Sequence, residues 1–345
     1  MIATADVHQK RVKPDERPMS LLAVEGLAID VAQDGARRRL VHDATLEVAA
    51  GETLAVVGES GSGKSLTALA VMGLLPEALA VSAGRIVFEG EDLLAAGAAR
   101  MRALRGDRMA MVFQEPMTSL NPVRSIGAQL TEGVRLKRGM SRRAAEARAA
   151  ELLADVGVSD PERRLRQYPH QFSGGMRQRV MIAMALACEP RLLLADEPTT
   201  ALDVTIQAQI LSLASRLCRD HGVGLVLITH NLGIVARHAA RVSVMYGGRT
   251  VETAPARALY AAPAHPYTRG LLDSVPRLDA PREAGLTPIA GAPPDPMAEI
   301  PGCRFHPRCP HAIARCGAET PAPAWAEGRM VACWRPLSKA LEAAE

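Results

Sequence analysis

Residues 51–65 read Gly-Glu-Thr-Leu-Ala-Val-Val-Gly-Glu-Ser-Gly-Ser-Gly-Lys-Ser, and this stretch decides the fold. Residues 53–57 form a short apolar run between two glycines, which predicts a buried strand. A loop rich in glycine and serine follows. Because glycine lacks a Cβ and accepts positive φ, consecutive N–H groups of such a loop can point inward at a polyphosphate. The residues expected to form this phosphate-binding loop are Gly58, Ser60, Gly61, Ser62 and Gly63.

Lys64 and Ser65 come next and begin an apolar helical pattern. The N-terminus of a helix carries a partial positive charge, which favours the same anion. Lys64 would reach the β- and γ-phosphates, and the Ser65 hydroxyl would coordinate Mg²⁺. The alternative is an ordinary glycine-serine turn between a strand and a helix. The complete G-x-x-x-x-G-K-[ST] spacing favours a nucleotide-binding loop.

Length and composition limit the possible classes of protein. The 345 residues are enough for roughly two domains, and a net charge of +4 indicates no general affinity for nucleic acid or anionic membranes. Aromatic residues make up 3% of the chain, too few for a base-stacking platform. The longest apolar run, residues 180–188, has about half of the roughly 18 residues that span a bilayer. Residues 1–20 are polar and lack a signal core, so we expect a cytosolic protein with reduced cysteines.

Strand and helix patterns alternate along the first half of the chain. A polar turn at residues 33–35 precedes Arg37, Arg38 and Arg39, which we expect in a solvated loop. Residues 126–156 predict a separate helical insertion in which Ser141 is the N-cap. Strands are expected at residues 21–31, 44–49, 84–89 and 108–113, the last of which leads into Gln114.

The second half of the chain places polar residues at the ends of apolar elements. Ser173-Gly174-Gly175 precedes an apolar helix over residues 176–188, and Asp203 begins another helix. A strand over residues 192–195 ends in Asp196-Glu197, and a strand over residues 223–228 leads to His230. This alternation predicts an α/β fold with a mainly parallel sheet and ligands at the carboxyl ends of its strands.

The Asp196-Glu197 pair suits nucleotide hydrolysis. Asp196 can hold the Mg²⁺ shell, while Glu197 orients and deprotonates the attacking water. Phosphoryl transfer asks a protein mainly to position groups and to neutralise charge. The residues around this pair also have structural alternatives: Gln114 as a strand-end partner, Ser173 as an N-cap and His230 as a loop residue.

The order of these motifs resembles the ATP-binding cassette (ABC) ATPases over residues 21–254. The resemblance implies a P-loop NTPase of the ABC type, with an antiparallel β subdomain and a helical subdomain at about residues 115–188. ATP and Mg²⁺ are the implied cofactors. Gln114 would contact Mg²⁺ and water and signal to the transporter. Glu197 would be the general base, and His230 would sense the γ-phosphate.

The same resemblance implies a head-to-tail dimer. Ser173 and Gly175 would contact the γ-phosphate of ATP held on a second subunit, and Asp203 would make a contact across the dimer. The sequence departs from the family in two places. Met176 stands where Gln is more common, although peptide-importer ATPases also have this Met. Residues 29–46 contain none of the Phe, Tyr or Trp residues that usually stack on adenine, so the residue that contacts the base stays open.

The C-terminal part resembles the extension of oligopeptide and dipeptide importer ATPases. The motifs are His-Pro-Tyr-Thr-Arg-Gly from His265, Pro-Ile-Ala-Gly-Ala-Pro-Pro from Pro288 and Cys-Arg-Phe-His-Pro-Arg-Cys-Pro from Cys303. This divides the chain into a tail (1–20), a nucleotide-binding domain (21–255) and the extension (256–345).

The resemblance to that group implies a peripheral ATPase on the cytoplasmic face of the bacterial inner membrane. Its partners would be two membrane permeases, a second and non-identical ATPase subunit and an extracytoplasmic peptide-binding protein, but no nucleic acid. Near relatives import nickel complexes, glutathione or other small solutes, so these are alternative substrates. The opposing class is a soluble ABC ATPase of DNA repair, chromosome structure or translation. Such proteins generally carry a second cassette or a long coiled-coil insertion.

Four cysteines fall within the extension, at Cys303, Cys309, Cys316 and Cys333. Four thiols in an irregular segment suggest a metal, because ligation would stabilise a segment with little core of its own. Zinc ribbons favour pairs two to four residues apart, which this spacing lacks, and the Cys-Pro at Cys309 is similar to some iron–sulfur runs. We favour a [4Fe–4S] cluster. Zinc, with His306 or His311 as extra ligands, and free thiols are the alternatives, while Cys188 and Cys218 are expected in the core.

Overall fold

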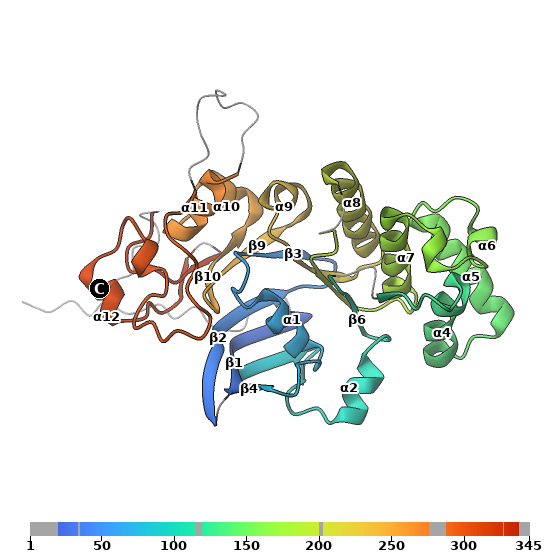
Figure 1. The fold of residues 1–345 in the computed structure, drawn as a ribbon, viewed down its shortest axis with the longest axis horizontal. Helices are drawn as coiled ribbons and strands as arrows, with labels where there is room; N and C mark the ends of the chain where they lie inside the picture. Colours follow the sequence, from blue (N-terminus) through green and yellow to red (C-terminus); the bar gives the residue numbers. More distant parts are fainter. Residues whose placement is uncertain are drawn as a thin grey trace, which may run out of the picture.

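The computed structural model describes residues 20–33, 35–114, 119–199, 203–275, 288–326 and 328–337. A central sheet separates a bundle of helices at one end of the molecule from the C-terminal extension at the other, and an antiparallel sheet lies below it (Figure 1). None of the helices in these ranges is both long enough and apolar enough to cross a membrane.

The strand that precedes the glycine-rich loop lies in the middle of the parallel part of the central sheet. This strand, β3 (Thr53–Val57), is flanked by β9 (Arg241–Tyr246) and β8 (Gly224–Ile228). The sheet continues through β7 (Leu192–Asp196) to β6 (Met109–Val112). Every residue of β3, β7 and β8 is buried, which explains why their sequences are unbroken apolar runs. The strands predicted here are confirmed.

The antiparallel sheet contains β1 (Leu22–Gln33), β2 (Ala36–Val48), β4 (Leu79–Phe88) and β5 (Glu91–Asp92). The prediction of a loop at Arg37–Arg39 is wrong, because these arginines lie in β2. They are exposed, but their backbones pair with β1, and Arg39 Nε donates to Asp30 Oδ1 at 3.0 Å. Strand pairing therefore overrides the polar character of the local sequence. Asp34 of the predicted turn lies outside the described residues.

The predicted helical insertion is confirmed as a bundle that begins with α4 (Ile126–Arg138) and α5 (Arg142–Asp155). The two helices are separated at Gly139, which has a φ of 64°. Ser141 is the N-cap of α5, since its side chain accepts a hydrogen bond from the Ala144 N–H. The apolar faces of both helices pack in one core with the helix after Ser173. The bundle is completed by α6 (Pro161–Arg164), η2 (Pro169–Gln171) and α7 (Gly174–Leu186).

Among the described residues, four further helices pack around the sheets. They are α1 (Lys64–Val71), α2 (Ala98–Leu104), α8 (Val204–Asp220) and α9 (Leu232–His238). The hairpin predicted at residues 241–252 is present, and β9 turns into β10 (Arg249–Pro255) through two glycines with positive φ.

The extension packs directly on the cassette. It contains α10 (Ala256–Ala261), α11 (Pro266–Asp273), η3 (His306–Arg308), α12 (Ala314–Ala318), β11 (Ala324–Ala326) and β12 (Arg329–Val331). Strand β12 pairs with β10, and Tyr267 and Phe305 share a core with Val57 of β3. The buried Glu252 carboxylate accepts hydrogen bonds from the Ala264 and His265 N–H groups at 2.9 and 2.8 Å. The extension and the central sheet therefore have a common interior. Of the predicted irregular segment at residues 276–301, the described part, 288–301, contains neither helix nor strand.

Candidate active site

The loop between β3 and α1 has the backbone geometry expected of a phosphate cradle. Gly61 and Gly63 have φ values of 77° and 97°, which disfavour other residues. Gly58 is required for a different reason: a Cβ there would lie 2.1 Å from the Met245 carbonyl oxygen. The adjacent strand β9 therefore leaves no room for a side chain at the start of the loop.

Lys64 is folded into this loop. Its Nζ donates to the Gly58 and Glu59 carbonyl oxygens at 2.8 and 2.9 Å and to Ser62 Oγ at 3.2 Å. The residue is only 5% exposed. Desolvation lowers the pKa of its ammonium, although the negative charges of Glu197, Asp196 and Glu59 act in the opposite direction. The loop thus holds a buried cation whose three N–H bonds are directed at oxygen atoms.

Two oxygen donors suited to a divalent cation meet beside the loop. Ser65 Oγ, at the start of α1, donates to Asp196 Oδ1, at the end of β7, at 3.0 Å. Asp196 is 6% exposed, and burial raises the pKa of its carboxyl. Hydroxyl and carboxylate oxygens are ligands that Mg²⁺ prefers. The oxygen atoms of Ser65 and Asp196 are therefore chemically suited to the predicted Mg²⁺ site.

The ends of three neighbouring strands bring Gln114, Glu197 and His230 together. Gln114 follows β6, and its Nε2 donates to Glu197 Oε2 at 3.2 Å. His230 follows β8, and its Nδ1 lies 3.4 Å from Glu197 Oε1. Glu197 itself has a φ of 42°, unusual for a residue with a side chain, and its N–H donates to the Ile228 carbonyl at 2.9 Å. A carboxylate held between an amide and an imidazole is placed to orient a small polar molecule such as water.

Ser173, Gly175 and Asp203 form a second group. Ser173 caps α7 by accepting from the Met176 N–H at 3.4 Å, and Asp203 caps α8 by accepting from the Ile206 N–H at 3.0 Å. A Cβ on Gly175 would lie 3.1 Å from Ile206 Cγ2, so the two helix starts pack closely. Among the described residues, no hydrogen bond or ion pair joins this group to the glycine-rich loop. One chain thus presents the two halves of the predicted site separately.

Comparisons with known proteins identify the family. Residues 41–200 match the family model "ABC transporter", and residues 251–316 match "Oligopeptide/dipeptide transporter, C-terminal region". The dipeptide transport ATP-binding protein DppD of Bacillus subtilis is 48% identical over 316 residues, which cover 91% of this chain and 94% of that protein. The chain belongs to the ABC ATPases of the oligopeptide/dipeptide transporter family.

Further relatives agree with this assignment to the ABC family. The oligopeptide transport ATP-binding protein OppD of Salmonella typhimurium is 46% identical over 321 residues, or 93% of this chain and 95% of its own length. Among solved structures, the ABC cassette MJ0796 in a dimeric post-hydrolysis state with ADP and Pi matches with a TM-score of 0.61 and 26% identity. It covers 68% of this chain and 99% of that chain.

One contact to the glycine-rich loop was not foreseen. The Glu59 N–H donates to the Tyr267 hydroxyl at 2.9 Å, although the two residues are 208 positions apart. Glu59 lies inside the quoted loop, and Tyr267 lies in the His-Pro-Tyr-Thr motif of the extension. Both motifs were visible in the sequence of this ABC ATPase, but nothing in either indicated that they touch.

The four cysteines of the extension line one small pocket. Cys303, Cys309, Cys316 and Cys333 are all part of its wall, together with His265, His306 and His311. Burial raises the pKa of the Cys303 and Cys309 thiols and raises that of Cys333 to about 12. Within the described ranges, no three His, Cys, Asp or Glu side chains are arranged to hold a single metal ion. Cys188 and Cys218 are buried in the core, as predicted.

Proposed function

We propose that this ABC ATPase hydrolyses ATP to power the import of dipeptides or oligopeptides. The similarity to the dipeptide and oligopeptide transport ATP-binding proteins carries the proposal, because it covers the cassette and the extension together. The group of Gln114, Glu197 and His230 at the ends of three strands supports hydrolysis. Nickel complexes, glutathione or other small solutes are the alternative cargoes.

The glycine-rich loop would hold the triphosphate of ATP. Lys64 would exchange its bonds to the Gly58 and Glu59 carbonyls for bonds to phosphate oxygens, which are stronger because the acceptor is charged. Ser65, Asp196 and Gln114 offer only oxygen ligands for Mg²⁺, and the ion would neutralise charge on the β- and γ-phosphates. The main task of this part of the chain is to position the phosphates.

Glu197 would act as the general base. Its carboxylate lies between Gln114 and His230, so a water bound there could lose a proton to it while the amide and imidazole fix its orientation. His230, with a side chain that is 63% exposed, could also reach the γ-phosphate. The unusual φ of Glu197 is consistent with a residue placed for function.

The second group, at the starts of α7 and α8, would complete the site of a neighbouring ATPase subunit. Ser173 and Gly175 present a serine hydroxyl and N–H groups at a helix N-terminus, which suit a phosphate. Asp203 would contact the neighbour across the same interface. We propose that the second subunit is a non-identical ATPase. Two nucleotides would then lie between the subunits in a head-to-tail arrangement.

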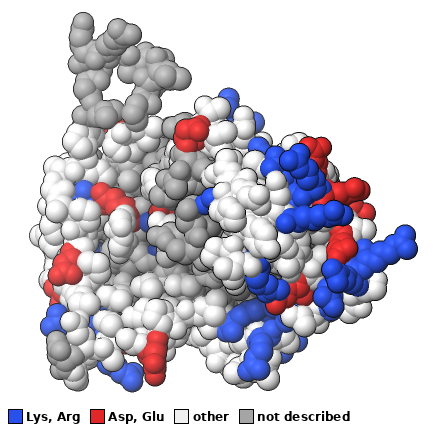
Figure 2. Space-filling model, turned by 45° about the vertical axis from the view of Figure 1, so that its right-hand side comes forward, with Lys and Arg blue, Asp and Glu red and all other residues white. Residues whose placement is uncertain are grey.

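The helical bundle offers a surface for the permeases. A groove of about 790 Å³ between α4, α5 and α6 is lined by Arg124, Arg135, Arg142 and Arg166. Lys and Arg side chains, with Asp and Glu among them, gather over this end of the molecule (Figure 2). Beside the groove, the apolar side chain of Val123 is 80% exposed. Arginine is among the residue types that are enriched at protein interfaces, so we propose this groove as the permease surface.

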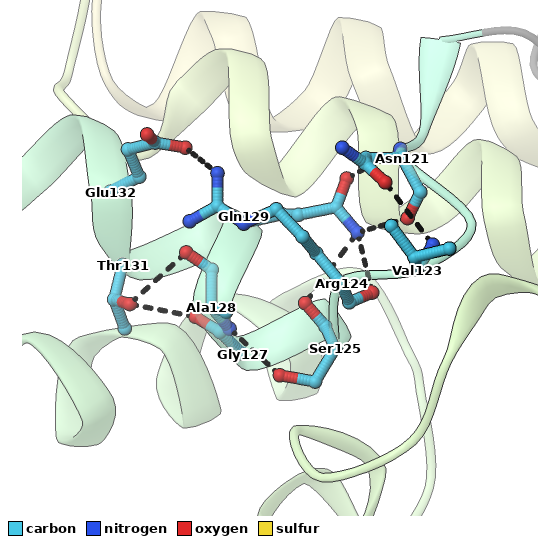
Figure 3. Close-up of polar contacts among 9 residues, drawn as sticks. All are labelled: Asn121, Val123, Arg124, Ser125, Gly127, Ala128, Gln129, Thr131 and Glu132. Atoms are coloured by element: carbon cyan, nitrogen blue, oxygen red, sulfur yellow. Dashed lines mark hydrogen bonds and ion pairs between the residues drawn. The ribbon is translucent and has the colours of Figure 1, made fainter.

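The segment that leads into α4 is held by hydrogen bonds to Gln129 of the same helix. Gln129 Nε2 donates to the Asn121 and Arg124 carbonyls, both at 3.0 Å, and its Oε1 accepts from the Asn121 N–H at 2.8 Å (Figure 3). Ser125 caps α4 within the same segment. Because this segment follows Gln114 in the chain, a permease bound there could respond to the state of the nucleotide site. The protein would thus sit on the cytoplasmic face of the inner membrane, receiving substrate through the permeases from an extracytoplasmic binding protein.

Reconstitution tests the transport function. We expect ATP turnover by the ATPase, assembled with its permeases and binding protein in vesicles, to rise when di- or oligopeptides are added, with uptake that requires ATP. Nickel complexes and glutathione, assayed in parallel, are the control substrates. Stimulation and uptake with one of these and not with peptides would contradict peptide import.

We also propose that the cysteine pocket holds a [4Fe–4S] cluster. Four cysteines that line one pocket are the ligand set that such a cluster uses, and soft thiolates select iron–sulfur over hard cations. Protein purified without oxygen is expected to contain about four iron and four sulfide per chain. Replacing Cys309 with serine should lower both, while the same change at the core residue Cys218 should not. Stoichiometric zinc, or no metal, would contradict the assignment of a [4Fe–4S] cluster.

A further inference from the structure

The extension contacts the glycine-rich loop through Arg308 as well as through Tyr267. The guanidinium of Arg308 forms a bidentate ion pair with Glu59, from NH1 to Oε2 at 2.7 Å and from NH2 to Oε1 at 3.1 Å. The Arg308 side chain is 6% exposed and that of Glu59 is 26% exposed. A bidentate pair that is largely shielded from water fixes both partners in position, unlike a surface ion pair.

Arg308 uses all of its donors. Its Nε donates to the Ala290 carbonyl at 2.9 Å, NH1 also donates to the Tyr246 hydroxyl at 3.3 Å, and NH2 also donates to the Ile289 carbonyl at 3.4 Å. Together with the two bonds to Glu59, these account for every N–H of a guanidinium group. A lysine could not reproduce this geometry, because its ammonium has three donors and no planar fork.

Three motifs of the extension therefore take part in this contact: two touch the loop, and the third holds Arg308. Tyr267 comes from the motif that begins at His265, Ile289 and Ala290 from the motif that begins at Pro288, and Arg308 from the motif that contains Cys303. The extension also lies close to the loop at Gly61, since a Cβ there would lie 3.5 Å from Pro296 Cγ. Neither the hydrolysis nor the cysteine ligation proposed above uses Tyr267 or Arg308.

We propose that Arg308 and Tyr267 are positioning residues for ATP binding, which hold the glycine-rich loop in its phosphate-binding conformation through Glu59. This rests on the proposed nucleotide site, but it does not require a metal in the cysteine pocket. The bonds fix the backbone and the side chain of Glu59, whose own carbonyl accepts from Lys64. A loop that is already ordered loses less conformational entropy when it binds a ligand.

The ion pair also has an electrostatic effect. Glu59 places a carboxylate in the loop that would receive a triphosphate, and the Arg308 guanidinium neutralises it. Loss of Arg308 would release the loop and also expose the incoming anion to an unpaired negative charge. Loss of Glu59 would release the loop but remove that charge. Comparing the Kd of the two variants therefore separates the effect of loop positioning from the effect of the unpaired charge.

The test measures the Kd of the full-length chain for Mg-ATP with a fluorescent ribose-labelled ATP, together with turnover at saturating ATP. We expect Arg308→Met to raise the Kd on the order of tenfold and Glu59→Gln to raise it by a smaller factor, because only the first leaves an unpaired carboxylate beside the phosphates. The double variant should bind ATP no more weakly than the Arg308→Met variant, and turnover per bound nucleotide should stay unchanged. Arg308→Lys should not restore affinity. Tyr267→Phe, which keeps the buried ring, should raise the Kd by a smaller factor.

The controls separate this inference from folding and from the site assignment. Arg269→Met, which breaks an exposed pair with Asp273 on the same helix as Tyr267, should leave the Kd unchanged. A purely structural role would lower the amount of competent protein without changing its Kd. Wild-type affinity in both Arg308→Met and Tyr267→Phe would overturn the inference if Lys64→Ala loses ATP. If Lys64→Ala also binds normally, the nucleotide site itself is wrong.

Discussion

Replacing Glu197 with glutamine is expected to lower ATP hydrolysis by at least about 100-fold while ATP binding is retained. The change keeps the size of the side chain and one acceptor for the Gln114 amide, but it removes the group that would take a proton from water. ATP that binds and is not hydrolysed should hold two ATPase subunits together. The variant should therefore form dimers that depend on ATP.

Two measurements check this result: phosphate release at saturating ATP, and molecular mass in solution with and without ATP. Glu91→Gln is the matched control, because Glu91 pairs with Arg100 at the surface and lies outside the site. Its hydrolysis should equal that of the unmodified protein. Undiminished phosphate release by the Glu197→Gln variant would show that another group is the base.

Replacing Lys64 with alanine should greatly raise the Kd for ATP. Hydrogen bonds to charged groups contribute about 1.5–3 kcal/mol, which corresponds to roughly 10- to 150-fold in Kd. The substitution also leaves the Gly58 and Glu59 carbonyls and Ser62 Oγ without their shared donor, so the loop loses an internal anchor. Both effects act in the same direction.

Equilibrium binding of Mg-ATP to the intact chain measures the effect of Lys64→Ala, and thermal unfolding without nucleotide verifies that the variant is folded. Lys137→Ala serves as the control, since Lys137 is an exposed residue of α4 that bonds to the Arg102 carbonyl. If the folded Lys64→Ala variant binds ATP as the control does, the glycine-rich loop is not the nucleotide site.

The sequence was most informative about residues that come directly after successive apolar strands. Each of β6, β7 and β8 is a short apolar run with polar residues at or just after its end, and parallel strands bring their carboxyl ends to one edge of the sheet. For this reason Gln114, Glu197 and His230 could be predicted to lie together. Ser141 and Ser173 were also predictable as N-caps, because capping is a local interaction.

Features that depend on tertiary contacts could not be read in this way. The arginines at the start of β2 have the composition of a solvated loop, and only pairing with β1 makes them a strand. Glu59 and Arg308 are 249 residues apart, so no local pattern connects them. Residues 1–19 of the predicted tail and residues 338–345 of the extension lie outside the described part of the chain.

A structure of the Glu197→Gln variant with ATP and Mg²⁺ tests the central claim most directly. We predict that the triphosphate lies along the loop from Gly58 to Ser65 and is covered by the start of the α7 helix of a neighbouring ATPase subunit. Ser173 and Gly175, or their equivalents in a non-identical partner, should contact the γ-phosphate. A triphosphate bound away from this loop would contradict the account, and so would a nucleotide-bound dimer in which the start of α7 faces away from the phosphates.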